Sequence, residues 1–129
     1  MKLRRLLLIL SLTPALLVLP ACGAKGGIDV KAGARTFASR CASCHQVGPQ
    51  ARAGFAPQLN GIVGRRAGST PDFRYSAAMQ QAGIVWSEQN LAAFIGDPQQ
   101  VVPGTSMRFW GMRDDAQVAN LVAYLRTLD

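Results

Sequence analysis

Cys41-Ala42-Ser43-Cys44-His45 is the stretch that decides the fold of this 129-residue sequence. Two thiols separated by two residues, followed at once by an imidazole, form the C-x-x-C-H pattern of covalent haem attachment. The spacing has a chemical reason, because each thiol can add to one of two neighbouring vinyl groups while the next side chain reaches the iron. The stretch predicts one haem c, held by Cys41 and Cys44, with His45 as the proximal iron ligand.

The same five residues admit three other interpretations, namely a disulfide, a redox-active dithiol and part of a zinc site. A thioredoxin-like dithiol is accompanied by a βαβ pattern, which this sequence lacks. Zinc requires four ligands, but His45 is the only histidine and Cys22 is the only further cysteine. The haem interpretation is therefore the best supported.

Helices are predicted on both sides of the motif. Asp29 is suited to cap a first helix that runs into the cysteines, and Asp114 with Gln117 fits a capping box at the start of a last helix. Gly33 would let these two terminal helices cross closely. The apolar stripes comprise Val30, Ala34, Phe37, Ala38 and Cys41 in the first helix and Val118, Leu121, Val122 and Leu125 in the last.

Shorter helices are expected in the middle of the chain. Ser87 can cap a helix that carries Leu91, Phe94 and Ile95 and stops at Gly96-Asp97-Pro98. Another runs from Ser76 to Ala82 and ends at Gly83. The segments 46–72 and 99–113 show neither helical nor strand periodicity. Loops of this length in a small all-α domain indicate that a large apolar group supplies part of the core.

The sixth iron ligand cannot be a second histidine within this chain, which leaves methionine as the expected alternative. Met79, Met107 and Met112 remain beyond the initiator, and methionine more often fills core gaps than binds iron. Met107 ends a Pro-Gly-Thr-Ser-Met turn suited to presenting a thioether inward. Met107 is therefore the predicted ligand, with Met112 as the alternative.

The two haem propionates need hydrogen-bond donors if they are buried. Arg65, Tyr75 and Trp86 offer a guanidinium, a phenol hydroxyl and an indole N–H. Each could equally be solvated or packed in the core, so spacing alone leaves this assignment open.

The first 21 residues have the form of an export signal, with basic residues ahead of the apolar run 6–19. Leu19-Pro20-Ala21-Cys22 resembles a bacterial lipoprotein cleavage site. We therefore expect a leader over 1–21, a tether over 22–27 and one domain over 28–129, attached to a membrane surface through a lipid on Cys22. Ordinary cleavage and an uncleaved anchor are the alternatives, although the run is shorter than the about 20 residues of a spanning helix.

The charge argues against nucleic-acid binding. The formal net charge is +7, and loss of Lys2, Arg4 and Arg5 with the leader lowers it by three, to +4. The remaining arginines are scattered among apolar residues rather than clustered, unlike those of a nucleic-acid-binding domain. This charge is consistent with steering towards an acidic partner.

The chain resembles the mitochondrial and bacterial class I cytochromes c, collinearly from about residue 28 to 128. Beyond the cysteine motif, the resemblance rests on Trp86 and on Ala-Pro-Gln-Leu-Asn-Gly at 56–61, Gly-Arg-Arg-Ala-Gly at 64–68, Phe-Arg-Tyr-Ser at 73–76 and Pro-Gly-Thr-Ser-Met at 103–107. It implies the all-α cytochrome c fold, with the terminal helices crossing and short helices and loops wrapped around one covalent haem.

The resemblance also implies roles for single residues. Pro57 matches the residue whose carbonyl accepts a hydrogen bond from the proximal histidine, and Met107 matches the distal ligand. The propionate contacts would be made by Arg65, Tyr75 and Trp86, with Thr105 as a further polar contact.

Three departures distinguish this chain from the mitochondrial proteins. Phe94 replaces a tyrosine near the distal methionine, and Met79 replaces an asparagine that helps hold an internal water. Both changes make the distal side more apolar, which shifts the reduction potential upward. The lysine ring used for docking is missing, since only Lys25 and Lys31 follow the leader.

The expected function is a one-electron carrier in the periplasm that serves membrane-bound or periplasmic redox proteins and is not itself an enzyme. A haem subunit of a larger oxidoreductase is the main alternative. A ligand-binding or peroxidatic role is less favoured, because peroxide cleavage requires a distal acid or base and the single histidine is already used.

Overall fold

The computed structural model describes residues 26–128, and the described chain contains five α-helices. In chain order these are α1 (Val30–Arg40), α2 (Ala77–Gln81), α3 (Glu88–Gly96), α4 (Pro98–Val101) and α5 (Asp115–Leu125). The only β-type pairing within these residues is an isolated antiparallel bridge between Arg66 and Val85. The predicted all-α class is confirmed.

The expected leader over 1–21 and Cys22 of the expected tether lie outside the described residues. Within 26–128, none of the helices combines the length and the apolar character needed to cross a membrane.

Each helix begins at a polar side chain that accepts a hydrogen bond from a backbone N–H three residues later. The predicted caps Asp29, Ser76, Ser87 and Asp114 all do this. Such caps satisfy N–H groups that the first helical turn leaves without partners. The capping box predicted for α5 is only half formed, because the Gln117 amide donates to the Asp114 carboxylate at 3.1 Å.

α4 was not predicted from the sequence. Pro98 ends α3, as expected, but it also occupies the first turn of α4, where Asp97 accepts a hydrogen bond from the N–H of Gln100 at 3.0 Å. A proline suits this position because its missing N–H would have no partner there and its φ is already helical. The same residue therefore separates two helices rather than beginning a loop.

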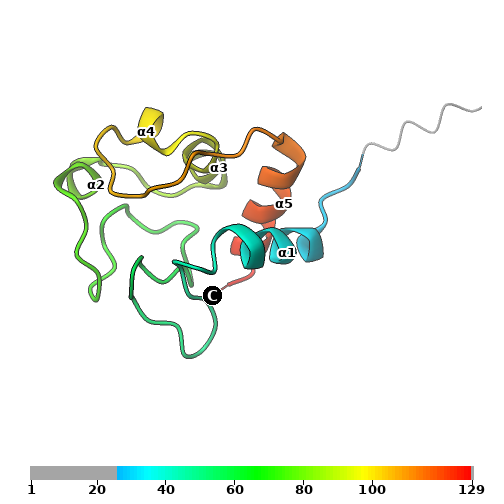
Figure 1. Cartoon of the computed structure of the whole chain (residues 1–129), viewed down its shortest axis with the longest axis horizontal. Helices are drawn as coiled ribbons and strands as arrows, with labels where there is room; N and C mark the ends of the chain where they lie inside the picture. Colours follow the sequence, from blue (N-terminus) through cyan, green and yellow to red (C-terminus); the bar gives the residue numbers. More distant parts are fainter. Residues whose placement is uncertain (1–25, 129) are drawn as a thin grey trace, which may run out of the picture.

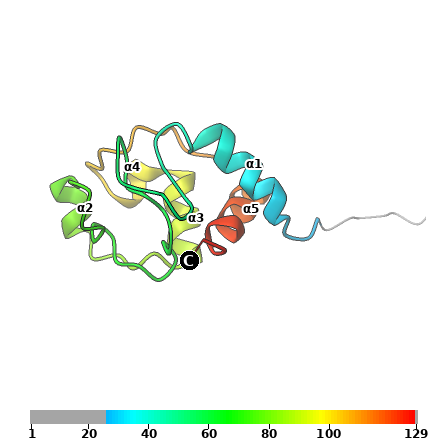
Figure 2. The ribbon, with the colours of Figure 1, turned by 90° about the horizontal axis from the view of Figure 1, so that it is seen from below.

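The terminal helices α1 and α5 cross closely (Figures 1 and 2). A Cβ added at the buried Gly33 would collide with the Asn120 carbonyl oxygen and come within 2.9 Å of the Tyr124 Cβ. The Asn120 side chain accepts a hydrogen bond from the Asp29 N–H at 2.8 Å, and the Phe37 and Tyr124 rings lie 5.7 Å apart. The predicted crossing is confirmed, and it fixes the end of α1 that leads into the cysteine motif.

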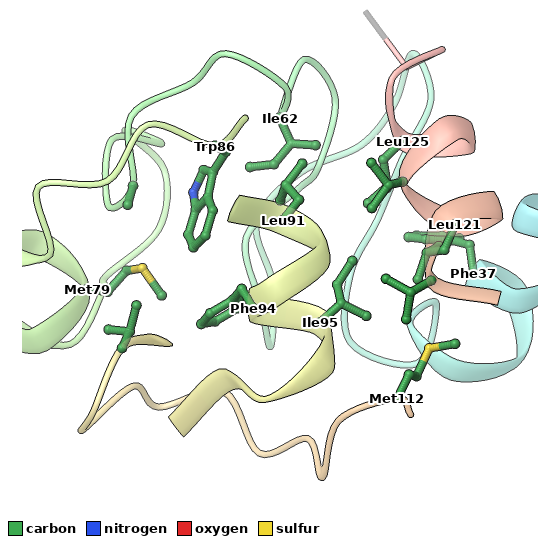
Figure 3. Packing of buried hydrophobic residues seen from close by; sticks show 14 residues of the cluster. Phe37, Ile62, Met79, Trp86, Leu91, Phe94, Ile95, Met112, Leu121 and Leu125 are labelled. Carbon is green, nitrogen blue, oxygen red and sulfur yellow. The ribbon is translucent and has the colours of Figure 1, made fainter. Parts of the chain in front are cut away.

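The hydrophobic core lies around α3 (Figure 3). Phe94 of α3 packs its ring 5.0 Å from that of Trp86, and Leu121 of α5 is only 1% exposed. The other large members of this cluster are Phe37, Ile62, Met79, Leu91, Ile95, Val102, Met112, Val118, Val122 and Leu125.

Side chains rather than regular elements hold the long segment between α1 and α2. Asn60 bonds both the N–H and the carbonyl of Gly48 at 2.8 Å. Asp72 accepts a hydrogen bond from the N–H of Ala53 at 2.9 Å. Irregular backbone needs such partners because an unpaired peptide group removed from water is costly. These bonds join positions far apart in the sequence and leave no periodic signal.

The crossing predicts that Gly33→Ala destabilises the protein. The added methyl meets backbone atoms of α5, so relief requires the helices to separate, at a cost of about 2 kcal/mol or more. This outweighs the gain of about 1 kcal/mol in helix propensity. Chemical denaturation of the holoprotein measures the loss, with Gly27→Ala as the control, since nothing lies within 4 Å of a Cβ at Gly27. Equal stability of the two variants would contradict the close crossing.

Candidate haem-binding site

An apolar cavity lies between the core helices and the two long connecting segments. The cysteine motif, the segment around Pro57, the segment leading into α2, and the segment around Met107 all contribute to its wall, together with α3 and α5. Six of the seven predicted site residues line it, namely Cys41, Cys44, His45, Tyr75, Trp86 and Met107. Residues up to 66 positions apart in the chain are thus brought to one site.

The two cysteines lie in the turn that follows α1. The N–H groups of Cys44 and His45 both donate to the Cys41 carbonyl, at 3.0 and 2.9 Å. Cys41 and Cys44 are both partly buried and are not joined to each other by a disulfide. Burial and the neighbouring Cys44 raise the pKa of the Cys41 thiol to about 11. A redox-active dithiol needs a lowered pKa, so this environment does not favour the thioredoxin-like alternative.

The His45 imidazole is held by one backbone contact. Its Nδ1 donates to the carbonyl oxygen of Pro57 over 2.8 Å, since a carbonyl can only accept. Burial lowers the pKa of His45, and the hydrogen bond to Pro57 partly opposes that effect. With the proton on Nδ1, Nε2 is the nitrogen with a free lone pair. The contact expected between Pro57 and the proximal histidine is present.

The three methionines occupy different environments. Met107 and Met79 both line the cavity, whereas Met112 does not. Met112 is buried near the C-terminal end of α3, where its N–H donates to the Ile95 carbonyl at 3.0 Å. Figure 3 shows Met79 and Met112 at opposite ends of the buried cluster. Met112, the alternative ligand, therefore does not share the cavity with the two cysteines and His45.

Arg65 differs from the other expected propionate contacts in that it does not line the cavity. Its guanidinium donates to the carbonyls of Gln58 and Asn60 at 3.0 and 2.9 Å, and so holds the segment that carries Pro57. Burial lowers the pKa of Arg65, while nearby Tyr75 and Asp72 raise it. Arg65 therefore lies near Tyr75, although Arg65 itself does not line the cavity.

Tyr75 and Trp86 also line the cavity. The Tyr75 hydroxyl donates its only proton to Oγ1 of the almost fully buried Thr70 at 2.8 Å. A propionate would receive that proton only if the Thr70 hydroxyl donated to Tyr75 instead. The Trp86 backbone is fixed by a hydrogen bond from its N–H to the Arg65 carbonyl at 2.9 Å. Sequence reasoning missed Thr70, because a threonine in a Gly- and Pro-containing loop carries no signal of burial.

Sequence reasoning also missed five residues of the wall. Arg40, Phe55, Ile62, Arg108 and Phe109 line the cavity. Arg40 is the last residue of α1, so its position next to the motif could have indicated it, whereas the other four lie in loops without periodicity. The buried Thr105, named above for a polar contact, also lines the cavity and accepts a hydrogen bond from the Met107 N–H at 3.3 Å.

The residues present fit a haem c. Two thiols, one imidazole and two thioethers line one apolar cavity, which matches the attachment and ligand chemistry of that group. Zinc fits less well, because residues 26–128 contain no group of three or more His, Cys, Asp and Glu side chains able to share a metal ion.

The chain is similar to known proteins over most of its length. Residues 30–129 match the family model described as Cytochrome c. The chain is 41% identical to cytochrome c2 of Rhodomicrobium vannielii over 118 residues, covering 92% of this chain and 93% of that protein. It is 39% identical to cytochrome c of Sesamum indicum over 98 residues, covering 76% and 88%. Among solved structures, cytochrome cH from Methylobacterium extorquens superposes with a TM-score of 0.72 at 36% identity, covering 77% of this chain and 98% of that one.

The family match and the C-x-x-C-H motif together identify the cofactor and the type of function. The protein carries one covalently attached haem c, transfers single electrons and is not an enzyme. Its fold is that of the solved relative, with helices and loops around the haem site. The chain belongs to the cytochrome c family.

Proposed function

We propose that this protein carries single electrons between periplasmic and membrane-bound redox proteins, with its iron bound by His45 Nε2 and Met107 Sδ. The proposal rests on one observation, which is that both side chains line the same apolar cavity while His45 Nδ1 is engaged by Pro57. We propose that the haem propionates are bound by Tyr75 and Trp86, which line the cavity, and by Arg65, which lies next to Tyr75 but does not line the cavity.

Haem c supplies the one-electron couple, and the chain holds it in a fixed environment. Pro57 fixes the tautomer and the ring orientation of His45 through the Nδ1 hydrogen bond. The imidazole and the thioether are both neutral, so neither ligand has to gain or lose a proton when the iron changes charge. Phe94 and Met79 add apolar surface to the wall, which disfavours the extra charge of the ferric state and raises the potential.

The lining of the cavity favours electron transfer over peroxide cleavage. None of the cavity-lining residues in the described part of the chain is Asp or Glu, and His45 already donates to Pro57. Peroxide cleavage needs a distal group that can accept and return a proton. The available distal side chains, Met79, Phe94 and Met107, cannot do this.

We further propose that Cys22 carries lipid after cleavage of the leader, so that the domain is tethered to a periplasmic membrane surface. Support comes from the Leu19-Pro20-Ala21-Cys22 sequence at the end of the apolar run. Residues 22–27 would serve as a short tether. Each buried methylene contributes about 0.8 kcal/mol, so several acyl chains make release negligible. The carrier would then diffuse in two dimensions beside membrane-bound partners.

Covalent attachment predicts that acidic acetone leaves the haem on the polypeptide. With both cysteines present, both vinyl groups are consumed, whereas Cys41→Ser leaves one vinyl group intact. The alkaline pyridine spectrum of Cys41→Ser should therefore lie at longer wavelength than that of the wild type. Extraction of haem from the wild-type chain would exclude thioether attachment.

Met107 ligation predicts the weak far-red absorption band of methionine-bound ferric haem. Met107→Ala removes the only thioether on the Pro-Gly-Thr-Ser-Met turn and should abolish the band. Met112→Ala is the matched control, because Met112 lies outside the cavity wall, and it should retain the band. Met79→Ala tests the other thioether in the cavity and should also retain it. Loss of the band in either of these variants but not in Met107→Ala would move the ligand to that residue.

Lipidation of Cys22 is tested by intact mass after detergent extraction of the membrane fraction. We expect a chain that begins at Cys22 and carries lipid mass, and we expect Cys22→Ser to appear in the soluble periplasmic fraction. An unmodified cleaved chain would indicate a soluble carrier, and retention of residues 1–21 would indicate an uncleaved anchor. Either result would contradict the lipid tether.

A further inference from the structure

The side chain of Gln99 makes two hydrogen bonds to the turn that carries Met107. Its Nε2 donates to the Thr105 carbonyl at 3.1 Å, and its Oε1 accepts from the Gly104 N–H at 3.2 Å. These partners fix the orientation of the amide, because a carbonyl only accepts and an N–H only donates. Both polar ends of one side chain are therefore bound to the middle of the turn.

The backbone of Gln99 is itself held in place by α4. Asp97 caps this helix, and the preceding Pro98 is fully buried. Val102, at the other end of the helix, is 3% exposed, and its N–H donates to the Pro98 carbonyl at 3.0 Å. Gln99 thus reaches the turn from a backbone that is anchored in the core on both sides.

The other hydrogen bonds of the turn span fewer residues. The Thr105 N–H donates to the Val102 carbonyl at 2.9 Å, and the Met107 N–H donates to the Thr105 hydroxyl at 3.3 Å. These two bonds shape the turn, but each joins residues only two or three positions apart. Gln99 instead binds residues five and six positions ahead of it, and so connects the first turn of α4 to the segment that ends at Met107.

Displacement of Met107 by an added ligand tests how firmly this segment is held. Neutral imidazole can bind the ferric iron only after Met107 Sδ has left it, so one iron–sulfur bond breaks, one iron–nitrogen bond forms, and no proton or electron is transferred. The apparent affinity for imidazole is the intrinsic affinity reduced by the small fraction of molecules in which the position is open. Any contact that exists only in the closed turn lowers that fraction.

We propose that Gln99 is a positioning residue that holds the turn of residues 103–107 closed and thereby keeps Met107 on the iron. This inference rests on the proposed ligation by Met107 and adds a residue that controls it. Movement of the turn away from the haem breaks both hydrogen bonds of the Gln99 amide. The amide is neutral, so this restraint does not change when the iron changes charge. It gives a role to α4, the helix that the sequence patterns did not predict.

The test is a titration of the ferric holoprotein with imidazole at fixed pH, followed through loss of the far-red band. Gln99→Ala removes both hydrogen bonds, and Gln99→Met removes them while keeping a long side chain. Alanine and methionine are at least as favourable as glutamine in a helix, so α4 is retained. Gln100→Ala is the matched control, because Gln100 is the next residue of α4, is exposed, and makes no side-chain hydrogen bond within residues 26–128.

We expect imidazole to bind Gln99→Ala and Gln99→Met about fivefold more tightly than the wild type, and Gln100→Ala to match the wild type. This factor is the low end of the range for two neutral hydrogen bonds, because Gln99 is exposed and water competes for its amide. Before imidazole is added, all three variants should show the far-red band.

Three results would overturn the inference. One is wild-type imidazole affinity in both Gln99 variants, even if chemical denaturation shows a loss of stability, because Gln99 would then support the fold without controlling Met107. Another is tighter binding in Gln99→Ala alone, which would assign the effect to side-chain bulk. The third is equally tight binding in Gln100→Ala, which would assign it to α4 as a whole. Absence of the far-red band from the wild-type protein would instead contradict ligation by Met107 itself.

Discussion

The contact of α1 with α5 at Gly33 is the interaction on which the rest of the structure depends. The two helices touch through backbone, because a side chain at Gly33 would occupy the space of the Asn120 carbonyl. This contact brings together elements from the two ends of the domain and fixes the C-terminal end of α1. Cys41 caps that end, so the turn that carries both thiols and His45 is anchored to the core through the helix that precedes it.

The second constraint is that the segment between α1 and α2, which has no regular secondary structure, must form part of the cavity wall. The segment after His45 has no helix until α2, and side-chain hydrogen bonds add to backbone hydrogen bonds such as those from Leu59 to Gln46 and from Gly64 to Trp86. Asn60 closes the segment onto Gly48, and Arg65 binds the carbonyls of Gln58 and Asn60. Both contacts hold the region of Pro57, whose carbonyl in turn orients His45. A residue that does not touch the cavity can thus determine the geometry of one that does.

These two constraints suit a carrier of electrons. A neutral imidazole held by a carbonyl, a thioether on a Gly- and Pro-containing turn, and an apolar wall together form an environment that needs little rearrangement when charge changes. The residues that line this cavity include the exposed Arg40 and Arg108.

Patterns that act over a few residues were sufficient to predict much of this architecture. The cysteine motif, the four caps at Asp29, Ser76, Ser87 and Asp114 and the apolar stripe of the last helix are all local patterns with direct physical causes. The stripe predicted for the first helix is only partly right, because Phe37 is buried but Val30 and Ala38 are exposed. α4 was missed because Pro98 was interpreted only as a terminator, although a proline equally suits a first turn. At Asp114 the capping box is half formed because the Gln117 amide N–H donates to the carboxylate, whereas in a full box the Gln117 oxygen would accept from the Asp114 N–H.

The sequence by itself determined the chemistry of the site, because a haem c needs two thiols and a histidine at one spacing and the chain has only one such place. Tertiary structure decided which other side chains line the cavity beside the cysteine motif. Met107 and Met112 differ little as residues in a loop, but only Met107 lines the cavity. Arg65 binds backbone carbonyls and does not line the cavity, Thr70 is buried next to Tyr75, and Trp110 is exposed to solvent. The reason is physical, since burial and contact depend on segments that are distant in sequence and meet only when the chain has folded.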